Sequence, residues 1–319
     1  MNNFKKIGLT ALAASLVSVS AYAGEMSVAG GASATLKNNS GTDGGKSITM
    51  GNQLTFTGGG ELDNGLNVAL SFVLDHADNV ASGFDSHSLT VSSDSLGSLT
   101  IAGDGTGNAQ SALDTTAAGD IWDNGFTHGL AATKYVAMAG STADNNKSVN
   151  YTLPTIMDDL TLTASYSGTT KETTSTTAFG VTYAGVEGLS VSYGVGENGS
   201  TAATTSGDVT TMKASYAIGS FTAAYSNTES DKDSTGTDEE MSSFKLSYTV
   251  TDDLSISYGE ETHETTGTTV DEEFEAVSVS YTTGGMTITA AQYDAKGLAN
   301  TAGAANEAAR WKLGASFAF

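Results

Sequence analysis

The residue types that most often carry out catalysis are few or scattered in this chain. It contains no cysteine and four histidines, His76, His87, His128 and His263, none of which stands in a G-x-S-x-G or H-E-x-x-H setting. Serine and aspartate are abundant, but abundance alone does not define a catalytic triad. The sequence therefore excludes cysteine catalysis, and we predict that the protein is not an enzyme.

Acidic segments raise the question of metal binding. The segments ESDKDSTGTDEE (229–240) and GEETHETTGTTVDEE (259–273) are rich in carboxylates, and DGTGN (104–108) resembles a fragment of a calcium loop. None of them has the 12-residue spacing of an EF-hand, so no calcium site can be assigned. We predict no metal site and no cofactor. Weakly bound divalent cations, which could bridge these loops to anionic lipopolysaccharide, remain an alternative to an ordinary soluble surface.

The N-terminal segment predicts export from the cytoplasm. It contains Lys5 and Lys6, an apolar run over residues 7–19, and the small residues Ala21 and Ala23. This is the pattern of a secretory signal peptide over residues 1–23, with the mature chain beginning at Gly24. A membrane anchor is the weaker alternative, because the apolar run is too short to span a bilayer.

The mature chain is strongly acidic. Loss of Lys5 and Lys6 would change the formal net charge from −23 to −25. Nucleic acid is therefore not an expected partner, because binding it requires Lys and Arg opposite the phosphates. No apolar run in the mature sequence is long enough for a membrane-spanning helix.

Alternation with a period of two runs through almost the whole mature chain. Apolar residues alternate with Ser, Thr, Lys and Gly, as in the set Leu66, Val68, Leu70, Phe72 and Leu74. This period indicates β-strands with one apolar and one polar face. Eight tyrosines close such apolar faces, at positions suited to a membrane interface. They are Tyr166, Tyr183, Tyr193, Tyr216, Tyr225, Tyr248, Tyr258 and Tyr281.

The connections between these strands alternate in length. Short ones are expected at 59–64, 94–97, 154–158, 185–188, 218–219, 251–253 and 283–285. Long ones are expected at 38–45, 76–84, 104–144, 168–176, 197–207, 228–240, 263–272 and 294–308. Short turns at one end and long loops at the other are typical of transmembrane β-barrels, in which a closed sheet pairs every backbone group. We predict one all-β domain over residues 24–319, an antiparallel barrel of about 16 strands.

The C-terminal segment RWKLGASFAF is the clearest single strand. Trp311, Leu313, Phe317 and Phe319 share one face, and the chain ends on the aromatic ring of Phe319. An alternating strand with a terminal aromatic residue resembles the signal by which the outer-membrane assembly machinery recognises barrel proteins. We therefore predict that machinery as a partner.

Charged residues are expected to face each other across the interior. Four basic residues each lie between outward apolar neighbours: Lys213, Lys245, Arg310 and Lys312. The acidic candidates lie in the long interval 104–144: Asp104, Asp114, Asp120 and Asp123. Rings of carboxylates attract cations, so we predict weak cation preference. Two alternatives stay open, because these aspartates could be solvated turn formers and a register slip of one residue would reverse every face.

Three segments resemble general diffusion porins of the Gram-negative outer membrane, most closely the alphaproteobacterial type. They are SVNYTLPTIMDDLTLTASY (148–166), LGSLTIAGDG (96–105) and the terminal GASFAF, and the resemblance covers residues 24–319. It implies an outer-membrane homotrimer of 16-stranded barrels, each with a long third loop folded into the lumen, through which small hydrophilic solutes diffuse. Outer-membrane lipid and lipopolysaccharide are the implied surroundings.

The sequence departs from that family pattern in its charges. Arg310 is the only arginine, and Asp104 stands where the family often carries a basic residue. The family's arginine cluster opposite loop carboxylates is therefore not expected here. Outside the channel class, a structural or adhesive barrel without an open pore is the main alternative. A calcium-stabilised repeat protein would need nonapeptide Gly and Asp repeats, which are not found.

Overall fold

The computed structural model describes residues 25–39, 45–75, 84–104, 108–110, 112–113, 115–124, 126, 148–168, 175–198, 206–233 and 237–319. The predicted signal peptide and its cleavage residues Ala21, Ala23 and Gly24 lie outside these residues. Asp114, His76 and His128 also lie outside them, and the side chain of Asp104 is not described.

The described residues form sixteen strands in chain order. The first eight are β1 (Glu25–Asn39), β2 (Gly45–Glu61), β3 (Asn67–Asp75), β4 (Phe84–Ser93), β5 (Gly97–Asp104), β6 (Ser148–Thr152), β7 (Leu160–Ser167) and β8 (Thr176–Val186). The others are β9 (Leu189–Asn198), β10 (Gly207–Ile218), β11 (Phe221–Lys232), β12 (Glu239–Thr249), β13 (Leu254–Thr265), β14 (Glu272–Thr283), β15 (Met286–Lys296) and β16 (Ala308–Ala318). Within the described residues there are also three short 3₁₀ helices: η1 (Ile121–Asp123), η3 (Leu298–Asn300) and η4 (Ala304–Asn306).

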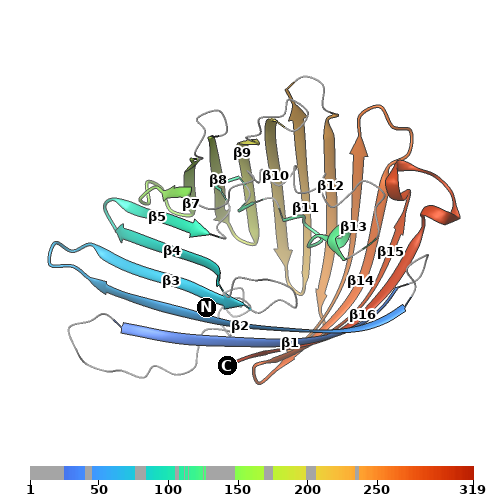
Figure 1. Ribbon diagram of the computed structural model, residues 1–319, viewed down its shortest axis with the longest axis horizontal. Coiled ribbons are helices and arrows are strands. Elements are labelled where there is room, and N and C mark those ends of the chain that lie inside the picture. Colours follow the sequence, from blue (N-terminus) through green and yellow to red (C-terminus); the bar gives the residue numbers. More distant parts are fainter. Residues whose placement is uncertain are drawn as a thin grey trace.

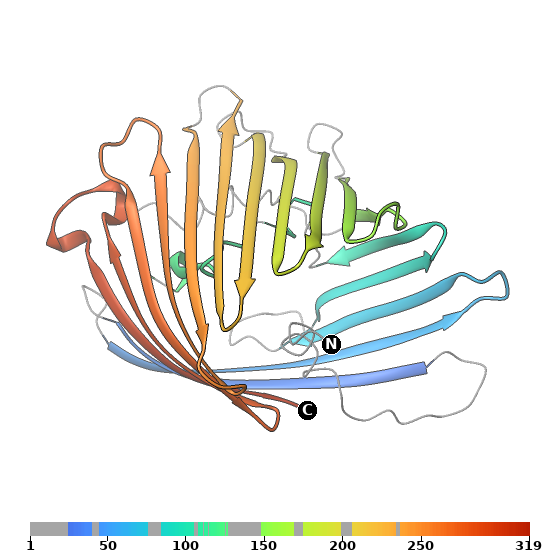
Figure 2. The same ribbon diagram turned by 180° about the vertical axis from the view of Figure 1, so that it is seen from behind.

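The strands form a closed antiparallel barrel (Figures 1 and 2). Each strand pairs with its neighbours in sequence, and β1 pairs with β16 to close the sheet, with Gly31 opposite Ala318 and Asn39 opposite Arg310. Beyond the last pair of that register, Phe319 N donates to Gly30 O at 2.9 Å and Gly30 N donates to Phe319 O at 2.7 Å. The predicted 16-stranded barrel is confirmed.

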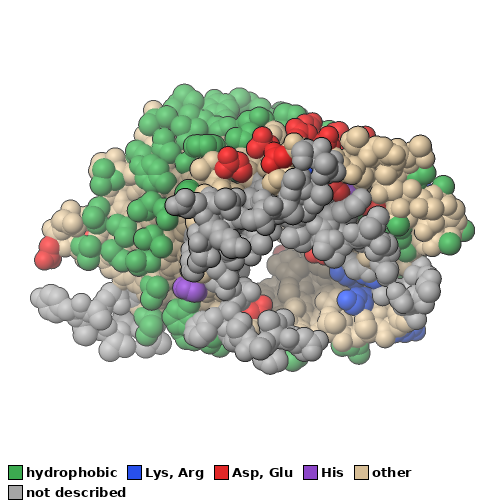
Figure 3. Space-filling view, turned by 45° about the horizontal axis from the view of Figure 1, so that its top comes forward, with side chains coloured by type: hydrophobic (Ala, Val, Ile, Leu, Met, Phe, Trp, Pro, Cys, Tyr) green, Lys and Arg blue, Asp and Glu red, His purple; other side chains and the backbone are tan. Residues whose placement is uncertain are grey.

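Side chains alternate between the two faces of this sheet as the period of two predicts. On β13, for example, Ile256 is exposed on the outer face, whereas Glu261 and His263 are buried on the inner face. Apolar side chains cover much of the outer surface in the space-filling view, and the same view shows the barrel hollowed at its centre (Figure 3). Among the described residues, no helix is long and apolar enough to cross a membrane.

Several loops are shorter than the sequence predicts. Strand β11 continues to Lys232 and β12 begins at Glu239, so the connection expected over 228–240 is only 233–238. The connection predicted over 263–272 is likewise shorter, because β13 continues to Thr265 and β14 begins at Glu272. Backbone pairing does not require apolar side chains, so these strands continue beyond the apolar band with carboxylates on their outer face.

Tight turns join the strands at the opposite end of the barrel. In the connection between β8 and β9, Gly188 adopts the left-handed conformation with φ of 78°, and a Cβ atom there would lie 2.3 Å from Ala217 O. Only glycine fits this position without strain. The turn chemistry therefore agrees with the short connection predicted over 185–188.

Candidate functional site

The described part of the β5–β6 connection lies against the polar face of the barrel wall. We call its described residues between 108 and 126 the anchored loop. Its first contacts are with β7 and β10, where Ala109 N donates to Ser165 Oγ at 2.9 Å and Gln110 Nε2 donates to Thr211 Oγ1 at 2.8 Å. Ser165 and Thr211 are buried, as expected for inward-facing side chains covered by another segment.

The middle of the anchored loop binds the next two strands in the same way. Ala117 N donates to Ser226 Oγ on β11 at 2.8 Å, and Ala118 N donates to Ser243 Oγ on β12 at 2.9 Å. Small hydroxyl side chains thus supply acceptors for loop N–H groups that have no partner in a ladder.

Glu261 on β13 is a buried carboxylate that holds the anchored loop directly. It is 1% exposed. Its Oε1 accepts a hydrogen bond from Thr116 Oγ1, and its Oε2 accepts one from Trp122 N at 2.9 Å. Asp120 Oδ1 in turn accepts from Thr116 N at 3.0 Å, which closes a turn within the loop. Glu261 thus accepts two hydrogen bonds from the anchored loop, whereas Ser165, Ser226 and Ser243 each accept one.

Glycines on the wall allow the loop backbone to approach closely. A Cβ atom on Gly180 would lie 2.8 Å from Ala109 O, one on Gly196 would lie 3.1 Å from Gln110 Cβ, and one on Gly259 would lie 2.8 Å from Ala118 Cβ. Strand glycines often mark a close approach of another backbone. Here they form the shallow surface that receives the loop.

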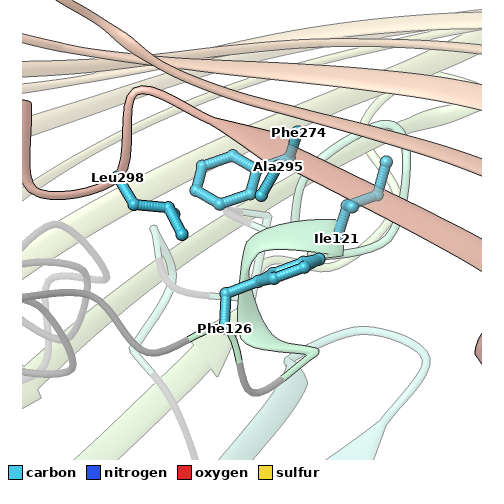
Figure 4. Close-up of a cluster of buried hydrophobic side chains, with 5 residues drawn as sticks. All are labelled: Ile121, Phe126, Phe274, Ala295 and Leu298. Atoms are coloured by element: carbon cyan, nitrogen blue, oxygen red, sulfur yellow. The ribbon is translucent and has the colours of Figure 1, made fainter. Parts of the chain in front are cut away.

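Apolar packing holds the far end of the anchored loop. Ile121 and Phe126 pack with Phe274 on β14, Ala295 on β15 and Leu298 in η3 (Figure 4). The rings of Phe126 and Phe274 are 5.7 Å apart between centroids. Burial of each large side chain contributes about 1.5–3 kcal/mol. Most inward-facing side chains of the wall are polar, and this cluster joins three separate parts of the chain.

Basic side chains gather where β1 meets β16. Lys37 lies opposite Lys312 in the β1–β16 ladder, and Lys312 Nζ donates to Asn124 Oδ1 of the anchored loop. Lys37 and Arg310 repel the charge of Lys312, while Asp123 attracts it. The guanidinium carbon of Arg310 lies 5.5 Å from the centroid of the Phe126 ring. We call Lys37, Arg310 and Lys312 the basic patch.

The predicted site residues fall into different environments. Arg310 and Lys312 belong to the basic patch, whereas Lys213 on β10 donates from Nζ to Thr115 O at 2.6 Å. Lys245 lies on β12 between the exposed Phe244 and Leu246. Asp123 is exposed in η1. Asp120 accepts a hydrogen bond from Thr116 N within the loop, and this bond favours the interpretation of Asp120 as a turn former.

Sequence reasoning missed three contributors to this site. Glu261 lies among several other carboxylates, and Leu298 stands in a segment without periodicity. Lys37 could have been found, because it lies between Leu36 and Asn38 in an alternating strand. Alternation from the outward Leu36, without the requirement of an apolar neighbour on both sides, would have placed Lys37 on the inner face.

The outer ends of β11–β13 enclose an acidic pocket of about 520 Å³. Its lining includes Glu229, Asp231, Glu240 and Glu264, within the two acidic segments noted in the sequence. Across the part of the chain that the structure describes, no three His, Cys, Asp or Glu side chains converge in a way that would hold a metal ion.

A closed antiparallel barrel with an apolar outer surface and a polar inner wall defines the class of outer-membrane β-barrel proteins. The family model described as Gram-negative porin matches residues 8–319. The chain therefore belongs to the Gram-negative porin family, and its location is the outer membrane. The alphaproteobacterial type stays a prediction.

Solved structures show the same fold at low sequence identity. An anion-selective porin from Comamonas acidovorans has a TM-score of 0.73 at 16% identity, covering 92% of this chain and 99% of that one. The trimer form of OmpT from Vibrio cholerae has a TM-score of 0.66 at 18% identity, covering 93% and 100%. A variant of the Rh. blastica porin has a TM-score of 0.65 at 13% identity, covering 92% and 100%. No curated sequence relative matches the chain.

Proposed function

We propose that the protein is a passive pore for ions and small hydrophilic solutes, with weak preference for cations. The observation that carries this proposal is the row of contacts from Ala109 to Asn124, in which the third long loop follows the inward-facing side chains of the wall. A loop in that position narrows the lumen. The prediction that the whole interval 104–144 folds inward extends beyond the described residues.

Cation preference is proposed from the balance of charges. Asp123 is exposed beside the passage, and the chain as a whole is strongly acidic. Carboxylates along a passage raise the local concentration of cations. The basic patch and the anion-selective relative favour the opposite sign, so anion preference is the second candidate.

The test is conductance of the purified protein in a planar bilayer, with the reversal potential recorded across a salt gradient. We expect conductance in steps of three, as for a trimer, and a reversal potential of the sign for cations. Replacing Asp114, Asp120 and Asp123 with Asn should reduce the cation preference. Two charges 4 Å apart interact by about 1 kcal/mol in water and by less in salt, so we expect a change of only a few-fold.

The matched control variant combines Asp63→Asn, Asp94→Asn and Asp252→Asn, which together remove three charges from exposed turns at the other end of the barrel. It should leave the reversal potential unchanged. If replacing the three loop aspartates leaves the reversal potential unchanged, their role in cation preference is rejected. If the reversal potential of the wild-type protein has the sign for anions, the basic patch is favoured as the source of selectivity. Folded protein that never conducts would favour the structural or adhesive barrel.

We infer the partners and surroundings of this protein from those expected for outer-membrane β-barrel proteins. The proposal includes a homotrimer, which is supported by the trimer form of the OmpT relative, and contacts with lipopolysaccharide and the barrel assembly machinery. Divalent cations held weakly by the acidic pocket would neutralise carboxylates that stand next to lipid phosphates. We propose no catalytic role, and membership of the porin family supports this.

A further inference from the structure

The seam between β1 and β16 places two lysines side by side on the inner wall. Lys37 on β1 lies directly opposite Lys312 on β16, and side chains opposite each other in an antiparallel ladder share one face of the sheet. That face is the lumen side, because Lys312 Nζ donates to Asn124 Oδ1 of the anchored loop. The neighbouring Leu313 is exposed on the outer face. Figure 3 shows basic side chains on the wall beside the hollow.

This arrangement of charges is unfavourable by itself. Like charges directly opposite each other destabilise a sheet, and both Lys37 and Arg310 repel the charge of Lys312. Arg310 follows on the same face of β16, because successive side chains alternate between faces. Asp123 attracts Lys312. In the described part of the chain, however, the ion pairs involve other residues, and none joins Lys312 to a carboxylate.

Lys37 has still fewer partners than Lys312. Across the residues that the structure describes, its ammonium group makes neither a hydrogen bond nor an ion pair, and its neighbour on β2 is the neutral Ser47. Lys232 and Lys296, in contrast, each lie within 4.0 Å of a glutamate carboxylate. The chain contains 36 acidic and 13 basic residues, so acidic residues are plentiful. The seam therefore keeps a positive charge that a dissolved anion can neutralise.

We propose that Lys37 and Lys312 form a subsite for a phosphate group, either free phosphate or the phosphate of a small ester. The Cβ atoms of residues opposite each other in a ladder are about 4.5–5.5 Å apart, so both ammonium groups can reach one anion. Each ammonium group has three N–H donors, and Lys312 uses one of them on Asn124. A phosphate ester carries close to two negative charges near pH 7 and offers three acceptor oxygens. Chloride has one charge and gains less from two lysines.

The subsite goes beyond passive diffusion, because it retains one class of solute on the wall of the passage. Lysine binds phosphate as a point charge, and Arg310 adds a further positive charge on the same strand face. As a step in permeation, the subsite rests on the proposed pore function. Binding of phosphate to the folded protein does not require the pore to conduct, so the two can be measured separately.

Isothermal titration calorimetry of the purified protein in detergent and chloride buffer tests the subsite. The probes are inorganic phosphate and glycerol phosphate. We expect Lys37→Gln to weaken the binding of phosphate about fivefold, the factor that corresponds to about 1 kcal/mol for a solvated ion pair. Lys37→Arg keeps the charge and should keep the binding. Lys46→Gln is the matched control, because Lys46 is exposed on the adjacent strand β2, opposite Asn38 and on the outer face. It should leave the affinity unchanged.

Lys312→Gln is the second variant, and it keeps the proposal testable if Lys37→Gln does not fold. Equal affinity for both probes supports recognition of the phosphate group itself, and tighter binding of inorganic phosphate supports a subsite for the free ion. Absence of binding to the wild-type protein would overturn the subsite. An equal loss of affinity in Lys46→Gln and Lys37→Gln would also overturn it, because the effect would then come from net charge alone.

Channel recording separates this proposal from the pore function. Phosphate added to a conducting wild-type channel should reduce the current more than it does in Lys37→Gln. Protein that binds phosphate but never conducts would keep the subsite and reject the pore. Protein that conducts but binds no phosphate would keep the pore and reject the subsite.

Discussion

Replacement of Glu261 by alanine should release the anchored loop from β13. The carboxylate accepts one hydrogen bond from Thr116 Oγ1 and one from Trp122 N. Each bond to a charged group contributes about 1.5–3 kcal/mol, so both together contribute at most about 6 kcal/mol. Water entering the vacated space restores part of this, and we expect a net loss of about 3 kcal/mol. That loss shifts the equilibrium between docked and released loop by a factor of about 100.

Single-channel recording is the appropriate assay for this change. The remaining anchors at Ser226 and Ser243 keep part of the loop on the wall, so we expect larger current fluctuations rather than complete opening. Glu260→Ala is the matched control, because the neighbouring side chain carries the same charge but is exposed on the outer face. Equal conductance and equal noise in Glu261→Ala and wild-type protein would refute the assignment of Glu261 as an anchor.

Two glycine substitutions test other contacts. A Cβ atom added at Gly259 would lie 2.8 Å from Ala118 Cβ, so Gly259→Val crowds the anchored loop. Overpacking of this kind costs about 1–3 kcal/mol, and it should displace the loop and alter conductance. Gly45→Ala is the control, because the space around Gly45 is open, and it should not alter conductance. Gly30→Leu should lower the temperature at which the folded barrel unfolds in detergent electrophoresis, because the Phe319 ring occupies the space over Gly30. Gly31→Ala makes an ordinary contact at 3.6 Å from Phe317 O and should be neutral; equal unfolding temperatures for the two variants would contradict the role of the Phe319 ring.

The fold could be predicted because its signal is local. A period of two is visible within a few residues, and the alternation of Trp311, Leu313 and Phe317 identifies the last strand without knowledge of its partner. Strand ends were less predictable. The rule relied on apolar side chains, whereas pairing continues beyond the apolar band through Glu229 and Asp231.

The contacts of the site could not be predicted in the same way. Alternation assigns both Glu261 and His263 to the inner face. It does not reveal that Glu261 contacts the anchored loop, or that His263 contacts Glu239 and Glu272. Those partners are brought together by the register of neighbouring strands and by the path of a loop more than a hundred residues away. Leu298 lies in a connection of small residues, where no periodicity indicates burial.

The pairing of β1 with β16 has a consequence for how long the barrel survives. Open sheets can lose strands one at a time from an edge, but a closed ladder has no edge from which to unzip. The seam also joins the two most distant strands of the chain, so closing it demands the largest loss of chain entropy and is expected late in folding. Once the seam is formed, any one strand can leave the closed barrel only if both of the ladders that flank it are broken. The lifetime of the folded protein should therefore be set by a high unfolding barrier more than by its equilibrium stability.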